Sequence, residues 1–446
     1  MFGSSVPMSV VRVSSYFMLS STLFVLCRPE GAAMSMSRTV PVKPRSERQE
    51  KAAPTRWVWL AAWPVTAVFV LSNAATPLYV LWQRDLGFSK GTLTVVFAFY
   101  IVGLIGSLLV SGVLSDRLGR KPVLLPALAL ALAACLIFAT AGSVAALIVA
   151  RLFAGIAVGA VVSGGMAAVS DVAGPGRARL GALLASCAMV FGAGLGPLLA
   201  GVLSEALPAP TVTVFAVEAA LLASAVAVVL RMPLPVARGR ASAAGSWVRV
   251  PAVPRGNGRH LALGVAVFAP GITATSFVLS LGPSLLTGLL GGTNRIVPGA
   301  MAFVMFLAST GVQFAVQRLR RGAILIAGAT STALAMVALV VAVQAASIQV
   351  LAVAALLAGA GQGMGQLGGL SLLNSTVPAG RLAEANAALN VGGYLLAGLL
   401  PVSAGYLSDA MGLTGGTTLF GAVLMTLAVV GGLVVVLGRR WVPEPR

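Results

Sequence analysis

Charged residues are scarce in this chain. Of its 446 residues only 9% are charged and 11 are acidic, whereas 58% are hydrophobic and the mean hydropathy is +0.98. A soluble globular protein carries about 25% charged residues, so this composition excludes an ordinary cytosolic or secreted fold. It also excludes a disordered chain, because such chains are polar and poor in aliphatic residues. The composition therefore predicts a membrane protein with many spans.

Residues with metal-binding or nucleophilic chemistry are also few. The three cysteines, Cys27, Cys135 and Cys187, are far apart, which excludes a disulfide framework and a CxxC metal site. The single histidine, His260, follows Arg259 in a basic loop and has no ligand partners nearby in the sequence. The chain also lacks the P-loop, HExxH and GxSxG sequences. We therefore expect no enzymatic activity, no cofactor and no metal.

Long apolar runs fill the chain from Trp57 onward. A membrane-spanning helix needs about 20 mostly apolar residues, and these runs are too long and too uniformly apolar for the strands of a barrel. The expected fold is an all-α membrane protein with twelve transmembrane helices. Their expected bounds are 57–82, 92–114, 122–141, 143–170, 180–203, 211–230, 261–290, 298–317, 322–343, 348–373, 382–408 and 416–438.

Lysine and arginine are distributed unevenly between the two sides of these spans. If both termini lie in the cytoplasm, 26 of the 30 basic residues fall in cytoplasmic segments, and the others are Arg84, Lys90, Arg151 and Arg295. Such an excess follows the positive-inside rule. The net charge of +19 is then explained by a basic face near anionic lipid. We therefore expect no nucleic acid as a partner. We expect a multi-pass protein of the bacterial inner (cytoplasmic) membrane with both termini inside.

Segments outside the spans are predicted to be cytoplasmic. Residues 1–56 form an N-terminal tail, of which 1–33 are not translated if synthesis starts at Met34 or Met36. An extra amphipathic or signal-like segment around the short apolar run 16–27 is the alternative. Residues 231–260 contain six arginines and no acid, and are predicted to link a half of residues 57–230 to a half of residues 261–438. Residues 439–446 form the C-terminal tail.

The two halves repeat each other in sequence. A shift of 204 residues aligns Ala154-Gly155 with Ala358-Gly359 and Leu203-Ser204-Glu205 with Leu407-Ser408-Asp409. The same ungapped register aligns six further positions. This repeat predicts two pseudo-symmetric six-helix halves, an architecture of transporters whose binding site lies between the repeats. The further aligned positions are Gly159 with Gly363, Gly164-Gly165 with Gly368-Gly369, Arg177 with Arg381, Pro197 with Pro401 and Gly201 with Gly405.

The loop between the second and third spans carries the most specific motif. Its sequence GVLSDRLGRK resembles the signature G-x-L-x-D-R-x-G-R-[KR] of the major facilitator superfamily. The resemblance implies a twelve-helix transporter in which Asp116 pairs with a nearby arginine and a helix N-terminus of the other half, and so latches one conformational state. A positive-inside anchor is the alternative. The equivalent loop at 317–321 lacks the acid, so the latch is expected to be asymmetric. The matching residues are Gly112, Asp116, Arg117, Gly119, Arg120 and Lys121.

Two ionisable residues are predicted within the membrane. Arg151 on the fourth span resembles the arginine of the superfamily's R-x-x-Q-G motif, with Ala154 in place of the glutamine. Charged residues at such depth are costly and mark functional sites. Glu218 on the sixth span lies at a similar depth, so we expect an Arg151–Glu218 pair that couples transport to protons, with Glu218 as the proton carrier. The alternative is that Arg151 extends outward and Glu218 stays protonated.

The fifth span carries the sequence GAGLGPLLAG over residues 192–201. It resembles the motif G-x-x-x-G-P-x-x-G-G, which marks antiporters and drug exporters within the superfamily, with Ala200 in place of one glycine. The resemblance implies the twelve-helix drug:proton antiporter branch. Small residues let helices approach closely and a proline permits a bend, so close packing without a bearing on transport direction is the alternative. The matching residues are Gly192, Gly196, Pro197 and Gly201.

Polar side chains on other spans are candidates for the substrate cavity. No acidic residue falls in the middle of the first, seventh, eighth or tenth span, which favours neutral or amphipathic organic cargo over dicarboxylates and sugar phosphates. An interhelical hydrogen bond, worth ~0.6 kcal/mol on average, is the alternative role for each residue. The candidates are Asn73, Tyr100, Gln362, Gln366, Asn386, Asn390 and Tyr394.

Together these features predict a secondary active transporter. We expect proton-coupled export of small hydrophobic or amphipathic compounds by rocking of the two halves about a cavity at the membrane midplane. The expected partners are a small-molecule substrate, the proton and membrane lipid, and the protein is expected to be a monomer. A facilitator or importer of a neutral metabolite is one alternative. A non-transporting membrane sensor or scaffold on the same fold is another.

Overall fold

The computed structural model describes residues 54–234, 248, 251–288, 291 and 294–442. These residues belong to one compact unit, Lys51–Arg446. The predictions for Met34, Met36 and Cys27, and for most of the tail 1–56, lie outside the described residues. The same holds for much of the predicted linker and for residues 443–446.

Six spans come from the first half of the chain, and two of them are interrupted. A 3-10 turn, η1 (Thr76–Leu78), divides the first span, where Pro77 lacks the N–H that a continuous helix needs. A π-helical turn, η2 (Val161–Gly165), divides the fourth. The helices are α1 (Thr55–Ala74), α2 (Tyr79–Leu86), α3 (Lys90–Leu118), α4 (Lys121–Ala139), α5 (Val144–Ala160), α6 (Met166–Ala173), α7 (Ala178–Ala206) and α8 (Pro210–Arg231), with the 3-10 turn η3 (Pro175–Arg177) before α7.

The second half contributes five helices. They are α9 (Gly258–Gly288), α10 (Ile296–Ala315), α11 (Arg321–Gln344), α12 (Ile348–Thr376) and α13 (Leu382–Leu437), with the 3-10 turns η4 (Ala379–Arg381) and η5 (Arg439–Trp441). Among the described residues, eleven helical segments are long and apolar enough to cross a membrane.

The last helical segment contains two spans. α13 has 56 residues, which corresponds to about 84 Å of straight helix at 1.5 Å per residue, far more than a hydrocarbon core of about 30 Å. Gly412 has φ 81° and ψ 161°, so the chain leaves the helical conformation there. The chain turns tightly at this point, because a Cβ atom at Gly416 would lie 2.6 Å from the backbone nitrogen of Ser408. The eleven segments therefore provide twelve spans, and the predicted all-α fold is confirmed.

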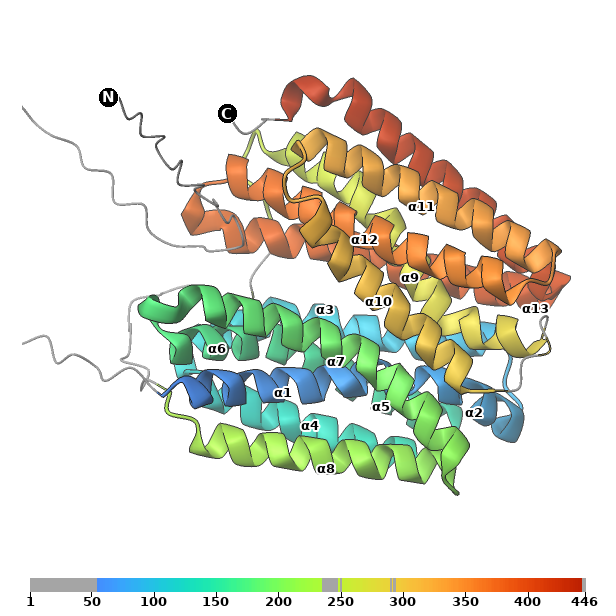
Figure 1. The fold of residues 1–446 in the computed structure, drawn as a ribbon, viewed down its shortest axis with the longest axis horizontal. Helices are drawn as coiled ribbons and strands as arrows, with labels where there is room; N and C mark the ends of the chain where they lie inside the picture. The colour runs from blue at the N-terminus through green and yellow to red at the C-terminus, as the bar shows by residue number, and fades with distance from the viewer. Residues whose placement is uncertain (1–53, 235–247, 249–250, 289–290, 292–293, 443–446) are drawn as a thin grey trace, which may run out of the picture. The chain divides into compact units, whose positions relative to one another are not determined.

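The helices pack in two groups that repeat the same arrangement (Figure 1). In the first group α5 packs against α3 and α4, α8 against α4, and α1 against α7. In the second group α12 packs against α10 and α11, while α13 packs against α11 and α9. The contacts between α7 and α10, and between α3 and α13, join the two groups. The pseudo-symmetry predicted from the 204-residue repeat is therefore present in the packing.

The two ends of the bundle differ in charge. One end carries Arg120 between α3 and α4, Arg231 at the end of α8, Arg321 at the start of α11 and Arg439 in η5. We call it the arginine-rich end. The opposite end carries the α2–α3 and α7–α8 turns and the start of α10. This distinction fixes where each part of the candidate site lies.

Candidate functional site

The loop signature forms an ion-pair network at the arginine-rich end. Arg120 donates to Asp116 at 2.9 Å and to Asp171 on α6 at 2.8 Å, and a further bond reaches Ser115. Burial lowers the pKa of Arg120, but the hydrogen bonds and charges of Asp171 and Asp116 outweigh this effect, so its pKa is raised above the ordinary value. The network ties α3 to the fourth span.

The remaining signature residues shape and extend this network. Gly112 is buried on α3, and Gly119 ends that helix with a φ of 96°, which a glycine adopts without strain. Lys121 donates to the carbonyl oxygen of Leu230 at the C-terminus of α8, at 2.9 Å. Arg117 lies in the last turn of α3, with partial exposure. Arg120, which pairs with Asp116, belongs to the same half of the molecule, and the latch to the other half remains a prediction.

An arginine of the second half contacts α12 at the arginine-rich end. Arg321 donates to the hydroxyl of Ser371 on α12 at 3.0 Å, with a separation of 50 residues, whereas Arg120 and Asp171 are 51 residues apart. The 204-residue shift aligns Ser371 with Ala167 rather than with Asp171, so this contact does not repeat the Arg120–Asp171 pair. The asymmetry of the latch expected from the two loop sequences stays a prediction.

Arg151 is fully buried and is held by the first span. Its Nε donates to the hydroxyl of Tyr79, and its Nη1 donates to the carbonyl oxygen of Ser72 at 2.7 Å. The guanidinium carbon lies 5.0 Å from the ring centroid of Tyr79, 5.4 Å from that of Phe97 and 5.7 Å from that of Tyr100. Within the described part of the chain Nη2 has no hydrogen-bond partner. A buried guanidinium therefore lies in an aromatic cage with one donor unused.

The expected ion pair between Arg151 and Glu218 is not formed. Glu218 is 97% buried on α8, close enough to Cys135 of α4 to interact with it electrostatically. Arg151 instead directs its donors toward the first span, because Tyr79 and Ser72 supply acceptors there. Among the described residues, the Oε2 atom of Glu218 has no hydrogen-bond partner. The two residues are thus separate buried groups, and a role for either in coupling stays a prediction.

The glycine–proline motif of α7 lies at the seam between the two halves. On one face, a Cβ atom at Gly196 would lie 2.0 Å from the carbonyl oxygen of Val70 on α1, and Gly192 packs against Phe69. On the other face, the carbonyl of Pro197 lies against α10, where a Cβ atom at Gly299 would be only 2.3 Å from it. The motif therefore lets α7 contact α1 and α10 at backbone distance.

The predicted cavity residues lie on four helices and differ in their surroundings. Asn73 is buried near the end of α1 and donates to Ser72 Oγ at 3.0 Å. Tyr100 of α3 is close enough to Tyr394 of α13 to interact with it electrostatically, so the two halves each bring a tyrosine to the same region. Gln362 and Gln366 lie on α12, and Asn386 and Asn390 on α13, all partly buried.

Two of these amides have unused buried acceptors. Gln362 Oε1 and Asn386 Oδ1 are buried without a hydrogen-bond partner among the described residues. Such groups are rare in folded proteins and call for a water or ligand partner. They are therefore better candidates for substrate contact than Asn73, whose amide is paired.

A pair of carboxylates that we did not predict joins the two halves at the opposite end. Asp409 on α13 accepts hydrogen bonds from the backbone amides of Lys90 at 2.9 Å and Gly91 at 2.8 Å, at the start of α3. Glu205 at the end of α7 accepts from the backbone amide of Arg295 at 3.4 Å and from its Nε at 2.8 Å, at the start of α10. Each carboxylate thus lies at a helix N-terminus of the other half, where the helix dipole favours negative charge. We call these two contacts the paired clamps.

A glycine one turn before each carboxylate permits the close approach. A Cβ atom at Gly201 would lie 2.6 Å from the carbonyl oxygen of Arg295, and one at Gly405 would lie 2.8 Å from that of Lys90. The 204-residue shift aligns Gly201 with Gly405 and Glu205 with Asp409. In the sequence, this site is visible only as an acidic residue at the equivalent position of both halves. The backbone amides that these carboxylates bind could not be predicted from the sequence.

A cavity of about 390 Å³ lies beside the clamps, between the halves. Leu81 and Arg84 of the first span line it from one half, and Leu286 and Arg295 line it from the other. None of the seven predicted cavity residues lines it. Their role in a substrate chamber remains a prediction.

Comparisons with known proteins agree with this architecture. The family model described as Major Facilitator Superfamily matches residues 58–315. The crystal structure of the nucleoside transporter NupG superposes with a TM-score of 0.68 at 13% identity, covering 85% of this chain and 99% of that one. A bacterial homologue of the human lysosomal transporter Spinster, in an inward-facing conformation, superposes with a TM-score of 0.66 at 12% identity, covering 87% and 97%.

A curated relative matches a shorter stretch. Over 100 residues the chain is 36% identical to the 3-(3-hydroxy-phenyl)propionate transporter of Escherichia coli, and this stretch is 22% of the present chain and 25% of the relative. The family match covers more than half of the chain, and the fold, the repeat and the loop signature agree with it. The chain therefore belongs to the major facilitator superfamily and is a multi-pass membrane transporter.

Proposed function

We propose that this transporter exports small hydrophobic or amphipathic compounds in exchange for protons, as members of the drug:proton antiporter branch do. In this proposal the arginine-rich end faces the cytoplasm, because the positive-inside rule assigns most Lys and Arg to that side. The two halves rock about a site between them, which opens first to one side of the membrane and then to the other.

The paired clamps are the observation that carries the proposal. They join the halves at the opposite end through Glu205 and Asp409, each bound to a helix N-terminus of the other half. A carboxylate at a helix N-terminus contributes ~0.3–1 kcal/mol when exposed and up to about 2 kcal/mol when partly buried. Contacts of this size hold one state closed without preventing its opening. This balance supports alternating access with the arginine-rich end open.

Proton coupling is assigned to Glu218. A carboxyl with a buried and unpartnered oxygen is costly to ionise, so its protonation can be coupled to a change in its surroundings. Arg151 does not pair with it, so in this proposal Arg151 positions the first span through Tyr79 and Ser72. One proton moving down ~100 mV releases about 2.3 kcal/mol, enough for a substrate gradient of roughly fifty-fold.

The interior polar groups favour uncharged or amphipathic cargo. Gln362 and Asn386 offer neutral acceptors that lack partners within the described residues, and Tyr100 and Tyr394 bring aromatic surface from both halves. Amide and aromatic groups bind polar and apolar parts of one molecule without selecting a charge.

Uptake of an aromatic carboxylate is a second candidate function. The unused Nη2 of Arg151 and its cage of Tyr79, Phe97 and Tyr100 offer a cation beside aromatic rings, and arginine binds carboxylates strongly. The name of the curated relative gives 3-(3-hydroxy-phenyl)propionate as the compound that it transports. This candidate differs from the first in direction as well as in cargo.

A dye assay in inside-out vesicles separates the two candidates. The vesicle lumen is acidified, and lipophilic cations, neutral amphiphiles and aromatic carboxylates are tested both outside and preloaded in the lumen. Antiport predicts loss of luminal acid when the compound is added outside. Proton-coupled uptake predicts it only when the compound is preloaded, because compound and proton then leave together.

Two carboxyl variants test the coupling assignment. Glu218→Gln is expected to abolish the proton signal, whereas Glu384→Gln, which neutralises a partly exposed carboxylate paired with Arg381, is expected to leave it unchanged. An unchanged signal in Glu218→Gln rejects Glu218 as the proton carrier. Equilibration of a compound without any proton movement rejects coupled export and favours a facilitator.

A further inference from the structure

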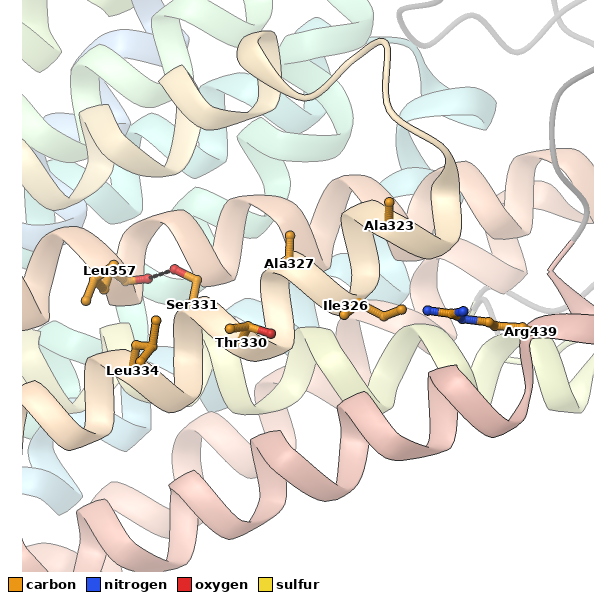
Figure 2. A pocket seen from close by; sticks show the side chains of 8 residues that line it. All are labelled: Ala323, Ile326, Ala327, Thr330, Ser331, Leu334, Leu357 and Arg439. Atoms are coloured by element: carbon orange, nitrogen blue, oxygen red, sulfur yellow. Dashed lines mark hydrogen bonds between the residues drawn. The ribbon is translucent and has the colours of Figure 1, made fainter.

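A groove of about 480 Å³ lies on the surface of α11 (Figure 2), whose main contacts are with α12, α13 and α9 of the same half. Small and apolar side chains line most of it, among them Ala323, Ala327 and Leu334 of α11 and Leu357 of α12. The hydroxyl of Ser331 donates to the carbonyl of Leu357 at 2.8 Å, so this polar group is satisfied within the protein. The lining therefore favours a hydrocarbon occupant.

The length of the groove matches one leaflet of a membrane. Ala323 and Leu334 are 11 positions apart on α11, which corresponds to about 16 Å at 1.5 Å per residue. Half of a hydrocarbon core of about 30 Å is about 15 Å. Leu334 is 52% exposed, so the groove opens sideways, toward the position of lipid in a membrane.

A single cation closes the groove at its arginine-rich end. Figure 2 shows the guanidinium of Arg439 directed toward Ile326. Among the residues that the structure describes, no carboxylate forms an ion pair with Arg439. The charge is therefore available at the depth where a lipid phosphate would lie.

Arg439 is held in place by a folded C-terminal turn. The ring of Trp441 lies 5.0 Å from the guanidinium carbon of Arg259 and 4.7 Å from that of Arg440. The Trp441 carbonyl lies 3.0 Å from Nε2 of His260, and Val442 is buried in a cluster with residues of α9 and α11. This packing positions η5 beside α11.

We propose that the groove binds an anionic phospholipid, with an acyl chain along α11 and the phosphate at Arg439. The charge of Arg439 complements a phosphate, and the apolar lining complements one acyl chain of a single leaflet. Anionic lipids are concentrated in the cytoplasmic leaflet, which the arginine-rich end faces if it lies in the cytoplasm. The binding site itself does not depend on the direction or the cargo of transport.

Native mass spectrometry of the full-length protein in detergent tests the headgroup contact. Phosphatidylglycerol and phosphatidylcholine with the same acyl chains are added separately. Arg439→Gln is expected to reduce phosphatidylglycerol occupancy about five-fold, the effect of one arginine near an anionic lipid surface, to the level of phosphatidylcholine. Arg440→Gln, the neighbouring arginine that lies over Trp441, is the matched control and is expected to keep wild-type occupancy.

A bulky substitution tests the acyl-chain contact. Ala327→Trp fills the groove and is expected to reduce binding of both lipids. Val341→Trp, at a 46% exposed position of α11 outside the groove, is expected to leave binding unchanged. Equal phosphatidylglycerol occupancy in Arg439→Gln and wild type overturns the proposal, as does displacement of the lipid by glycerol phosphate alone. The surface variant Arg439→Gln keeps the test decisive if Ala327→Trp does not fold.

Discussion

The partners of the buried Arg151 depend on the tertiary structure and do not follow from its position in the sequence. A charged side chain in a span needs partners, because isolated burial of a charge is very costly. Tyr79 and Ser72 on the first span supply two of them, and three aromatic rings surround the guanidinium. The residue therefore connects the fourth span to the first, and its free Nη2 faces no partner among the described residues.

At this scale we expect Arg151→Lys to be nearly as harmful as Arg151→Gln. A lysine keeps the charge, but its compact ammonium cannot reproduce the planar fork that serves Tyr79 and Ser72 together. Each lost bond to a charged group costs about 1.5–3 kcal/mol, so transport in proteoliposomes is expected to fall roughly ten-fold or more. Arg255→Gln, an exposed arginine before α9, is the control. Wild-type transport by Arg151→Lys would show that charge alone suffices.

In the proposed mechanism, the helix ends at the paired clamps decide the conformational state. α7 meets α10 and α13 meets α3 through the same combination of an acid and a glycine. Both contacts lie at the opposite end, so they join the halves at that end. Weakening either one is expected to shift the equilibrium toward opening there.

In the Asp409→Asn variant we expect a cysteine placed at position 286 to react faster with a maleimide. Leu286 lies beside the clamps and is 2% exposed. Loss of ~0.3–1 kcal/mol raises the open population about two- to five-fold, and the rate of labelling by a membrane-impermeant maleimide reports this rise. These variants are made in a protein whose native cysteines have been replaced, so that only the introduced cysteine reacts. Asp85→Asn, an exposed acid at the same end paired with Arg84, is the control, and equal rates in the two variants would contradict the clamp.

Glycine substitution tests the same contact through sterics. Gly201→Ala adds a Cβ atom that would lie 2.6 Å from the Arg295 carbonyl, whereas Gly106→Ala adds one on α3 that meets nothing within 4 Å. The first variant is expected to accelerate labelling at the Leu286 position and the second to leave it unchanged. An unchanged or slower labelling rate in Gly201→Ala would mean that the halves tolerate the methyl group without separating.

Across the whole molecule, the distribution of arginine is expected to fix the orientation in the membrane. Single cysteines at Gly142, between α4 and α5, and at Gly176, in η3, lie at opposite ends and at exposed positions with nothing within 4 Å of an added Cβ atom. In intact cells an impermeant maleimide is expected to label the cysteine at position 142, and to label that at 176 only after permeabilisation. The reverse pattern would place the arginine-rich end outside and overturn the proposed direction of transport.

The loop signature gives a second prediction at this scale. Asp116→Asn removes the charge that pairs with Arg120, and is expected to leave the protein folded in the membrane while transport falls about ten-fold, the result of ~1.4 kcal/mol in the balance between states. Surface amounts and transport are measured in the same vesicles, with Asp85→Asn as the matched control. Full activity in Asp116→Asn would remove the latch from the mechanism.

The sequence alone determined the class, the spans and the internal repeat. Scarce charge and long apolar runs predict membrane-spanning helices. In lipid every backbone N–H and C=O group needs a hydrogen-bond partner within the protein, and a helix supplies these partners within one segment. The 204-residue register predicted the equivalence of Gly201 and Gly405, and the signature at 112–121 predicted the superfamily. These inferences depend on local composition and spacing, which the sequence contains in full.

Only the tertiary structure decided which polar groups meet. Similar depth in the membrane suggested that Arg151 would pair with Glu218, but depth leaves the direction of a side chain around its helix undetermined. The packing turns Arg151 toward Tyr79 and leaves Glu218 near Cys135. In the same way, Asp409 finds its partner amide at Lys90, 319 residues away, because α13 and α3 come from different halves and the packing of those halves brings them together.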